Sequence, residues 1–88
     1  MYKQIMDRII IKEMKIKVKI SGNIFGLELD DDITLAKFKD IIGHKYGVSP
    51  TQVRVVFNKG ILKQENNTLK NLGVKDSSIV CCIIAKVS

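Results

Sequence analysis

The sequence predicts one α+β domain in which a mixed sheet of four to five strands packs on a single helix. Two alternating, strand-like runs flank a glycine-containing turn, one amphipathic helix follows them, and an apolar run of strand length closes the chain over 78–85. The 88 residues are 45% hydrophobic and 27% charged, as is usual for a globular chain.

The first two strands are predicted from an alternation with a period of two residues. In 14–20, lysines alternate with isoleucine and valine, which is typical of a half-buried strand. Residues 24–30 show a second alternation, in which every other residue is apolar. Ser21, Gly22 and Asn23 lie between the two runs, and we expect a tight hairpin turn there because Gly22 and Asn23 suit positive φ angles.

The helix is predicted over 35–46. Thr34 is a good N-cap, Gly47 suits the left-handed residue after a helix, and Pro50 prevents continuation. A single apolar stripe along this segment faces the predicted core. The stripe consists of Leu35, Phe38 and Ile42.

Three further segments complete the predicted sheet. Residues 52–57 read as a third strand, 58–60 as a turn and 61–62 as a very short strand. Leu69 and Leu72 bracket a short helical turn that stops at Gly73. The run at 78–85 is apolar on both faces, so we expect it in the middle of the sheet, beside the first strand and parallel to it.

The length and the composition restrict the function. A chain this short buries about 60–65% of its unfolded surface, which suffices for one core but not for an added deep catalytic cleft. We therefore expect no enzyme activity and no catalytic residue. No apolar stretch approaches the roughly 18 residues of a membrane span, and charges interrupt any signal peptide. We expect a monomer in the cytoplasm and/or nucleus, with no membrane association.

The positive charge is concentrated near the N-terminus. The chain has 15 Lys and Arg against 9 Asp and Glu, and 6 of those cations lie within residues 1–19. Residues 1–13 read as a basic, flexible extension whose secondary structure the pattern leaves open. A basic arm can bind nucleic acid. The alternative is a solvated surface, because no aromatic residue lies between these cations for base stacking.

Neither a disulfide nor a metal site is predicted. Cys81 and Cys82 are adjacent and cannot staple distant segments, and His44 is isolated. The acids at 30–32 suit a hairpin end and a helix lead-in rather than a cation site. Lys39 reads as a partly buried, charge-paired residue. We expect reduced thiols and no cofactor.

Taken in order, several segments resemble ubiquitin over 14–87. They are MKIKVKI, ITLAKFKDIIGHKYGV with the turn VSP, VRVVFNKGIL and NTLKNLGVKDSSIV. The resemblance implies a β-grasp fold. The run GILKQENNTLKNLGVKD is most similar to the ubiquitin-like domains of the ubiquilin and Dsk2 shuttle proteins.

Two departures from ubiquitin bear on function. The printed chain ends at Ser88 without the diglycine that conjugated members carry, so a covalent modifier would require a tail beyond this residue. Ser21 or Gly22 stands where ubiquitin has a leucine of its apolar patch. With that leucine missing, we expect a small apolar area and binding in the micromolar range.

Strand alternation, together with the resemblance, predicts a protein-binding patch on the sheet face away from the helix. We expect Val56 and Ile83 to be neighbours there, with Arg54 and Lys19 at the rim. The expected patch consists of Lys19, Arg54, Val56, Lys59, Gly60, Cys81 and Ile83.

The resemblance implies a non-catalytic interaction module that is part of a larger protein and links cargo to the proteasome. Its implied partners are ubiquitin-interacting-motif helices, ubiquitin-associated domains and proteasome receptor subunits. The alternative is a ubiquitin-like adaptor in RNA processing that uses the basic arm.

Overall fold

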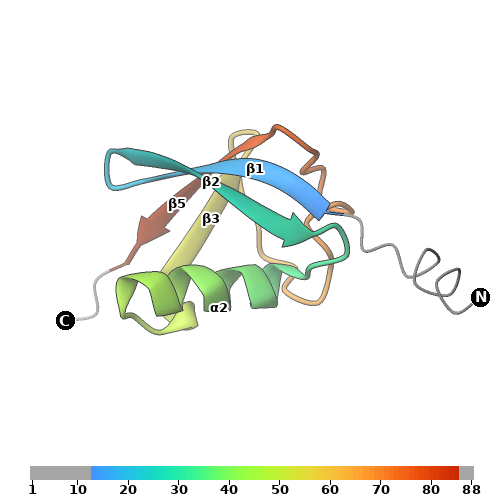
Figure 1. The fold of residues 1–88 in the computed structure, drawn as a ribbon. Helices are drawn as coiled ribbons and strands as arrows, with labels where there is room; N and C mark the ends of the chain where they lie inside the picture. Colours follow the sequence, from blue (N-terminus) through green and yellow to red (C-terminus); the bar gives the residue numbers. More distant parts are fainter. Residues whose placement is uncertain (1–12, 86–88) are drawn as a thin grey trace, which may run out of the picture.

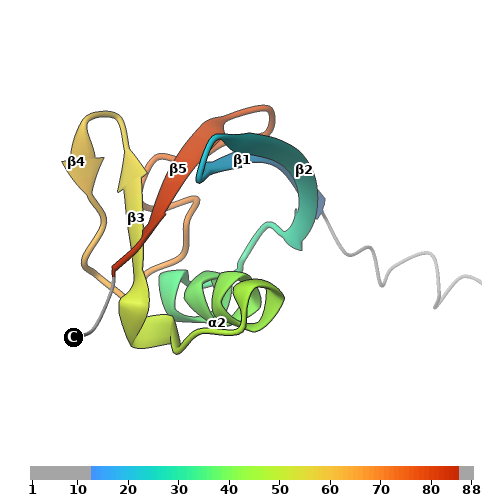
Figure 2. The same ribbon diagram turned by 90° about the vertical axis from the view of Figure 1, so that its left-hand side faces the viewer.

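The structure is a computed structural model that describes residues 13–85. Its elements are β1 (Glu13–Ile20), β2 (Asn23–Asp30), α2 (Leu35–Tyr46), the 3₁₀ turn η1 (Pro50–Gln52), β3 (Val53–Phe57), β4 (Gly60–Ile61) and β5 (Ile79–Ile84). The strands form one sheet in the order β2-β1-β5-β3-β4, and α2 lies across one of its faces (Figures 1 and 2). The predicted α+β architecture is confirmed. Most of the predicted N-terminal extension lies outside the described residues.

The hairpin of β1 and β2 turns through two residues. Ser21 and Gly22 have φ angles of 50° and 81°, the pattern of a tight turn that matches the twist of its strands. The prediction for Gly22 is confirmed, but the one for Asn23 is wrong. Asn23 pairs with Ile20 as the first residue of β2, so the second positive φ falls on Ser21.

Helix α2 has the predicted bounds and caps. The Thr34 hydroxyl accepts a hydrogen bond from the Lys37 backbone N–H at 3.2 Å. Gly47 adopts the left-handed conformation at φ 69°, and its N–H bonds back to the last turn of the helix. Leu35, Phe38 and Ile42 are fully buried against the sheet, so the predicted apolar stripe is also confirmed.

The segment after the helix contains a 3₁₀ turn that the sequence patterns did not identify. The Ser49 hydroxyl accepts from the Thr51 N–H at 3.3 Å, and the Gln52 carboxamide oxygen accepts from the Ser49 N–H at 3.2 Å. These two bonds form a capping box, with Pro50 at the first position. The signal is present in Ser-Pro-Thr-Gln, but the sequence analysis predicts only a turn and a helix stop at Pro50.

Strand β5 lies in the centre of the sheet, as predicted. It pairs in parallel with β1, where Val18 faces Val80, and antiparallel with β3, where Val55 faces Cys82. Val80 and Cys82 point toward α2 and are buried. Ile79 and Ile83 point the other way and are each 55% exposed. An apolar residue on each face is what a central strand requires.

The short connection between β3 and β4 is tighter than predicted. Asn58 and Lys59 both have positive φ angles, 55° and 68°, and form the whole turn. Gly60 therefore belongs to β4 rather than to the turn, and Ile61 pairs with Val56.

One hydrophobic core joins the sheet to the helix. The loop before β5 contributes to it through Leu69 and Val74, whose backbones are joined by a hydrogen bond of 2.9 Å. Within residues 13–85, no buried side-chain nitrogen or oxygen lacks a hydrogen-bond partner. The buried core residues are Met14, Ile16, Val18, Ile20, Leu29, Leu35, Phe38, Ile42, Val53, Val55, Leu69, Val74, Val80 and Cys82.

Replacing Gly43 tests how closely the chain returns past the helix. A Cβ at Gly43 would lie 2.7 Å from the Val48 carbonyl oxygen. Gly43→Ala should therefore lower the free energy of unfolding by about 1–3 kcal/mol, although alanine is the better helix former. Urea denaturation measures this. Asp40→Ala, at an exposed position of the same helix, is the control and should change stability by less than about 0.5 kcal/mol. A gain in stability for Gly43→Ala would contradict the packing described here.

Candidate protein-binding face

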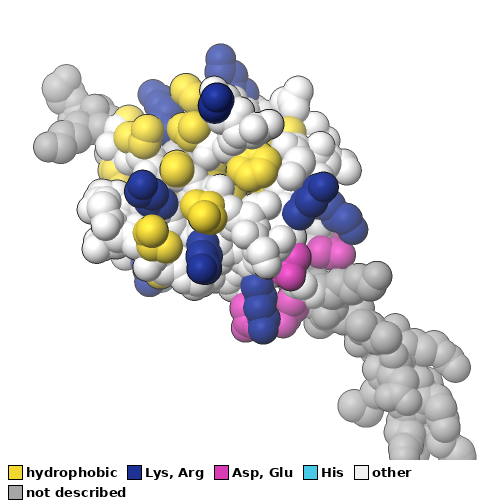
Figure 3. Space-filling view, turned by 90° about the horizontal axis from the view of Figure 1, so that it is seen from above, with side chains coloured by type: hydrophobic (Ala, Val, Ile, Leu, Met, Phe, Trp, Pro, Cys, Tyr) yellow, Lys and Arg dark blue, Asp and Glu magenta, His cyan; other side chains and the backbone are white. Residues whose placement is uncertain are grey.

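The sheet face opposite α2 carries side chains from all five strands, and we call it the open face. Figure 3 shows this face with hydrophobic side chains separated by lysine and arginine, while the visible acids gather near one edge. Register and alternation assign its residues: Lys15, Lys17 and Lys19 from β1, Ile24, Gly26 and Glu28 from β2, Arg54 and Val56 from β3, Ile61 from β4, and Ile79, Cys81 and Ile83 from β5.

One row of side chains crosses the whole sheet. Lys19 pairs directly with Ile24 on one side and with Cys81 on the other. Cys81 in turn pairs with Val56, and Val56 with Ile61. Directly paired residues have Cβ atoms about 5 Å apart, so this row is a continuous band of contacts from β2 to β4.

The predicted patch residues Val56, Cys81 and Ile83 lie together on β3 and β5. Ile83 pairs directly with Arg54, so it is a diagonal neighbour of Val56 rather than its direct partner. Diagonal neighbours remain within reach of aliphatic side chains. The three residues therefore form one apolar surface in which Ile83 is the most exposed member.

Cations lie within the open face. Lys19 occupies the second place in the row, between Ile24 and Cys81, so it borders the surface formed by Val56, Cys81 and Ile83. Lys15 Nζ lies 3.6 Å from a carboxylate oxygen of Glu28, a solvent-exposed pair of little energetic weight. Lys17, Lys19 and Arg54 have no ion pair among the described residues, so this surface is electropositive.

Three exposed isoleucines of the open face were missed by the sequence prediction. Ile24, Ile61 and Ile79 are 59%, 53% and 55% exposed. The signal for Ile79 was the same alternation that places Cys81 and Ile83 outward. Ile24 could have been identified from its place opposite Lys19 across the tight turn, but the prediction included Asn23 in that turn. The apolar surface thus extends well beyond Val56 and Ile83.

Two predicted patch residues lie apart from this row. Lys59 is exposed in the turn between β3 and β4. Gly60 pairs with Phe57, whose side chain packs against the core. Neither residue is brought into the row that contains Val56 and Cys81.

The two adjacent cysteines have opposite environments. Cys82 faces the core and is 3% exposed, whereas Cys81 lies partly exposed on the open face. Burial, with a smaller contribution from neighbouring Cys81, raises the pKa of the Cys82 thiol to about 12. Cys82 is therefore a protonated, inert core residue, and Cys81 is the thiol that solvent reaches.

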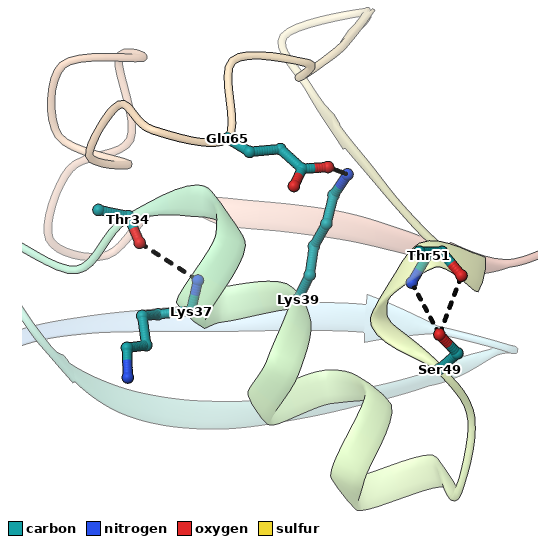
Figure 4. A network of polar contacts seen from close by, with 6 residues as sticks. All are labelled: Thr34, Lys37, Lys39, Ser49, Thr51 and Glu65. Carbon is teal, nitrogen blue, oxygen red and sulfur yellow. Dashed lines mark hydrogen bonds and ion pairs between the residues drawn. The ribbon is translucent and has the colours of Figure 1, made fainter.

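The polar contacts around the helix support the fold rather than a reaction. Lys39 Nζ lies 3.0 Å from a Glu65 carboxylate oxygen, and the Lys39 side chain is 12% exposed (Figure 4). This confirms the prediction that Lys39 is partly buried and charge-paired. This ion pair joins the loop before β5 to α2. The side chains of Thr34 and Ser49 cap the N-termini of α2 and η1 (Figure 4).

Within residues 13–85, histidine, cysteine, aspartate and glutamate side chains form no group of three that could hold a metal ion. The same residues contain no helix that is both long and apolar enough to span a membrane.

Selective alkylation tests the two cysteine environments. Iodoacetamide at pH 8 should add one group to the native protein, at Cys81, and two groups in denaturant, because only unfolding exposes Cys82. Mass spectrometry counts the adducts. Cys81→Ser, as the control, should leave the native protein unlabelled. Rapid double labelling of the native protein would show that Cys82 is not in the core.

Comparison with known proteins places the chain in a family. The family model for the ubiquitin family matches residues 14–87. A UV excision repair protein RAD23 homolog from Dictyostelium discoideum is 28% identical over 74 residues, which are 83% of this chain and 21% of that protein. This chain thus spans about a fifth of that relative's length.

Solved structures show the same fold. Ubiquitin of Caldiarchaeum subterraneum superposes with a TM-score of 0.76 at 25% identity and covers 88% of this chain and 99% of its own. The ubiquitin-like domain of Plasmodium falciparum Dsk2 gives a TM-score of 0.75 at 23% identity, over 84% of this chain and 100% of its own. The β-grasp fold that the sequence predicted is therefore confirmed, and the chain belongs to the ubiquitin family.

Proposed function

We propose that this domain is a non-catalytic interaction module whose open face binds helical segments of other proteins. The observation that carries the proposal is the contiguous surface of Val56, Cys81 and Ile83 on a sheet face that no described helix covers. Contiguous apolar surface with polar and charged surroundings is typical of protein-binding sites. A short amphipathic helix has the shape to lay its apolar side chains on it.

The charge of the open face selects the kind of helix. Lys19 and Arg54 flank the apolar residues and have no ion pair within the described chain. Acidic residues beside the partner's apolar anchor would face these cations, which favours association and orientation more than raw affinity. Ubiquitin-interacting-motif helices and ubiquitin-associated domains are the partners we propose. We expect micromolar affinity, about −6 to −8 kcal/mol.

The biological setting follows from the same family relationship. The matched relative is named as an excision repair protein and is several times longer than this chain. We propose that the domain likewise acts within a larger cytoplasmic or nuclear protein and joins cargo to proteasome receptor subunits or to ubiquitin-binding partners.

Single-stranded RNA is a poorer match for the open face. Such binding combines cations with aromatic side chains on which bases stack. The described open face has the cations but no aromatic residue, and its exposed large apolar side chains are isoleucines. The basic N-terminal segment lies outside the described residues and adds no geometry to this alternative.

Truncating Val56 tests the proposed surface. Val56→Ala should weaken binding of a ubiquitin-interacting-motif peptide about five- to tenfold, because an anchor residue at the centre of an interface contributes more than about 1 kcal/mol. Isothermal titration calorimetry on the full chain measures the affinity, and circular dichroism verifies the fold of each variant.

The matched control is Ile41→Ala. Ile41 is also an exposed aliphatic residue, at 38%, but it lies on α2 and away from the open face. Its truncation should leave the affinity unchanged. Weaker binding by Ile41→Ala together with unchanged binding by Val56→Ala would place the partner on the helix side and overturn the proposal.

A further inference from the structure

A hollow rich in cations lies beside the short strand β4, and we call it the cationic hollow. Strand β4 pairs with β3 over only two residues, and the Leu62 N–H still donates to the Val55 carbonyl oxygen at 2.8 Å before the chain leaves β3. Arg54 therefore has no paired residue on that side. The cationic hollow measures about 380 Å³ and is lined by Lys39, Arg54, Ile61, Leu62, Lys63 and Glu65.

Two of these cations lie opposite each other. Val56 pairs with Ile61, so the same register, continued past Leu62, places Lys63 opposite Arg54. Like charges at directly opposed positions destabilise a sheet. An anion bound between Arg54 and Lys63 would replace this repulsion with attraction to both.

The acids of the described chain do not balance these two cations. Among residues 13–85, Glu65 is the only carboxylate that lines the cationic hollow, and its oxygen lies 3.0 Å from Lys39 Nζ (Figure 4). Arg54 and Lys63 have no ion pair within the same residues. Three cations against one carboxylate leave the lining with two positive charges, which attract a doubly charged anion more strongly than a singly charged one.

We propose that the cationic hollow is a phosphate-binding subsite, and that it takes the phosphoryl group of a phosphoserine or phosphothreonine on the partner protein. Such a residue carries about −1.5 to −2 charges at pH 7 and offers three acceptor oxygens. The Arg54 guanidinium suits two parallel N–H bonds to this group, and the Lys63 ammonium adds a point charge. A carboxylate, or a phosphodiester of RNA, brings a single negative charge and balances half of the excess.

The subsite adjoins the surface formed by Val56, Cys81 and Ile83. Ile61 lines the cationic hollow and pairs directly with Val56, while Arg54 pairs directly with Ile83. A helix bound to the open face therefore brings residues near its apolar anchor to the rim of the hollow. The inference rests on the proposed function for the identity of the partner, and it makes the affinity depend on phosphorylation of that partner.

The first probe is N-acetyl-O-phosphoserine amide, which carries the phosphoryl group without the rest of a peptide. Chemical-shift titration of the isotope-labelled full chain, at constant ionic strength, should give saturable shifts at the Arg54 and Lys63 amides. Lys63→Gln should weaken this binding about tenfold, because it removes one charged hydrogen-bond donor. Lys75→Gln removes the same charge from an exposed position outside the hollow and should leave the affinity unchanged.

Urea denaturation shows whether Lys63→Gln acts on the site or on the fold. Lys63 is exposed and lies opposite another cation, so its replacement should leave the urea midpoint unchanged or raise it. Weaker phosphoserine binding together with a lower midpoint would mean that the substitution perturbs the fold, and would contradict the subsite.

Three results of the titration would overturn the inference. The first is the absence of saturable shifts at Arg54 and Lys63. The second is an equal weakening by Lys63→Gln and Lys75→Gln, which would report general attraction to a basic protein. The third is an equal affinity for N-acetylglutamate α-amide, which we expect to bind several-fold more weakly than the phosphoserine amide.

A phosphorylated peptide tests the connection with the open face. The ubiquitin-interacting-motif peptide is extended at one end or at the other by a flexible glycine–serine linker and a final phosphoserine, so that either orientation of the helix reaches the hollow. Phosphorylation should tighten binding of at least one of the two peptides about three- to tenfold, and of neither in Lys63→Gln. No gain for either peptide would overturn the inference.

Val56→Ala distinguishes failure of this inference from failure of the proposed function. Val56 does not line the cationic hollow, so the phosphoserine amide should bind this variant unchanged while the unphosphorylated peptide binds more weakly. No binding of the phosphoserine amide, with a peptide that remains sensitive to Val56→Ala, would overturn the subsite alone. Phosphoserine binding at the hollow, with a peptide insensitive to Val56→Ala, would overturn the proposed function and leave the hollow as a phosphate site.

Discussion

The position of β5 is the constraint on which the rest of the structure depends. Its backbone pairs with β1 on one side and with β3 on the other, and this joins the first hairpin to the later strands. A strand in this position alternates its side chains between two faces. Because α2 covers only one face, Val80 and Cys82 are sealed in the core while Ile79, Cys81 and Ile83 stay accessible. The apolar segment that forms β5 thus supplies side chains both to the core and to the open face.

The composition of the open face follows from demands that oppose one another. β-branched residues suit a pleated strand, so isoleucine and valine stabilise the sheet even where water reaches them. The same residues leave an apolar surface that would promote association between copies. Lys17, Lys19 and Arg54 lie among these residues and repel a second face of the same kind. We propose that this surface selects partners by charge and holds them by apolar contact, and both features favour an acidic amphipathic helix.

Most of the fold could be predicted because local patterns and packing agree. The helix bounds followed from Thr34, Gly47 and one apolar stripe, and the central place of β5 followed from its two apolar faces. The predictions missed two local features. The first hairpin turn has only two residues, so a positive φ falls on Ser21, and a capped 3₁₀ turn follows the helix. At the site, alternation identified Val56, Cys81 and Ile83. Ile24 was missed because its place opposite Lys19 depends on the two-residue turn, which the sequence pattern assigned to the wrong residue.

Mapping of backbone amide chemical shifts tests the binding role of the open face most directly. The isotope-labelled full chain is titrated with a ubiquitin-interacting-motif peptide, and every amide serves as a reporter of its own position. Binding at the open face predicts progressive shifts at Val56, Cys81 and Ile83, with Ile41 on α2 unchanged. Shifts confined to α2 around Ile41, with the β3 and β5 amides unmoved, would contradict a binding surface on the open face.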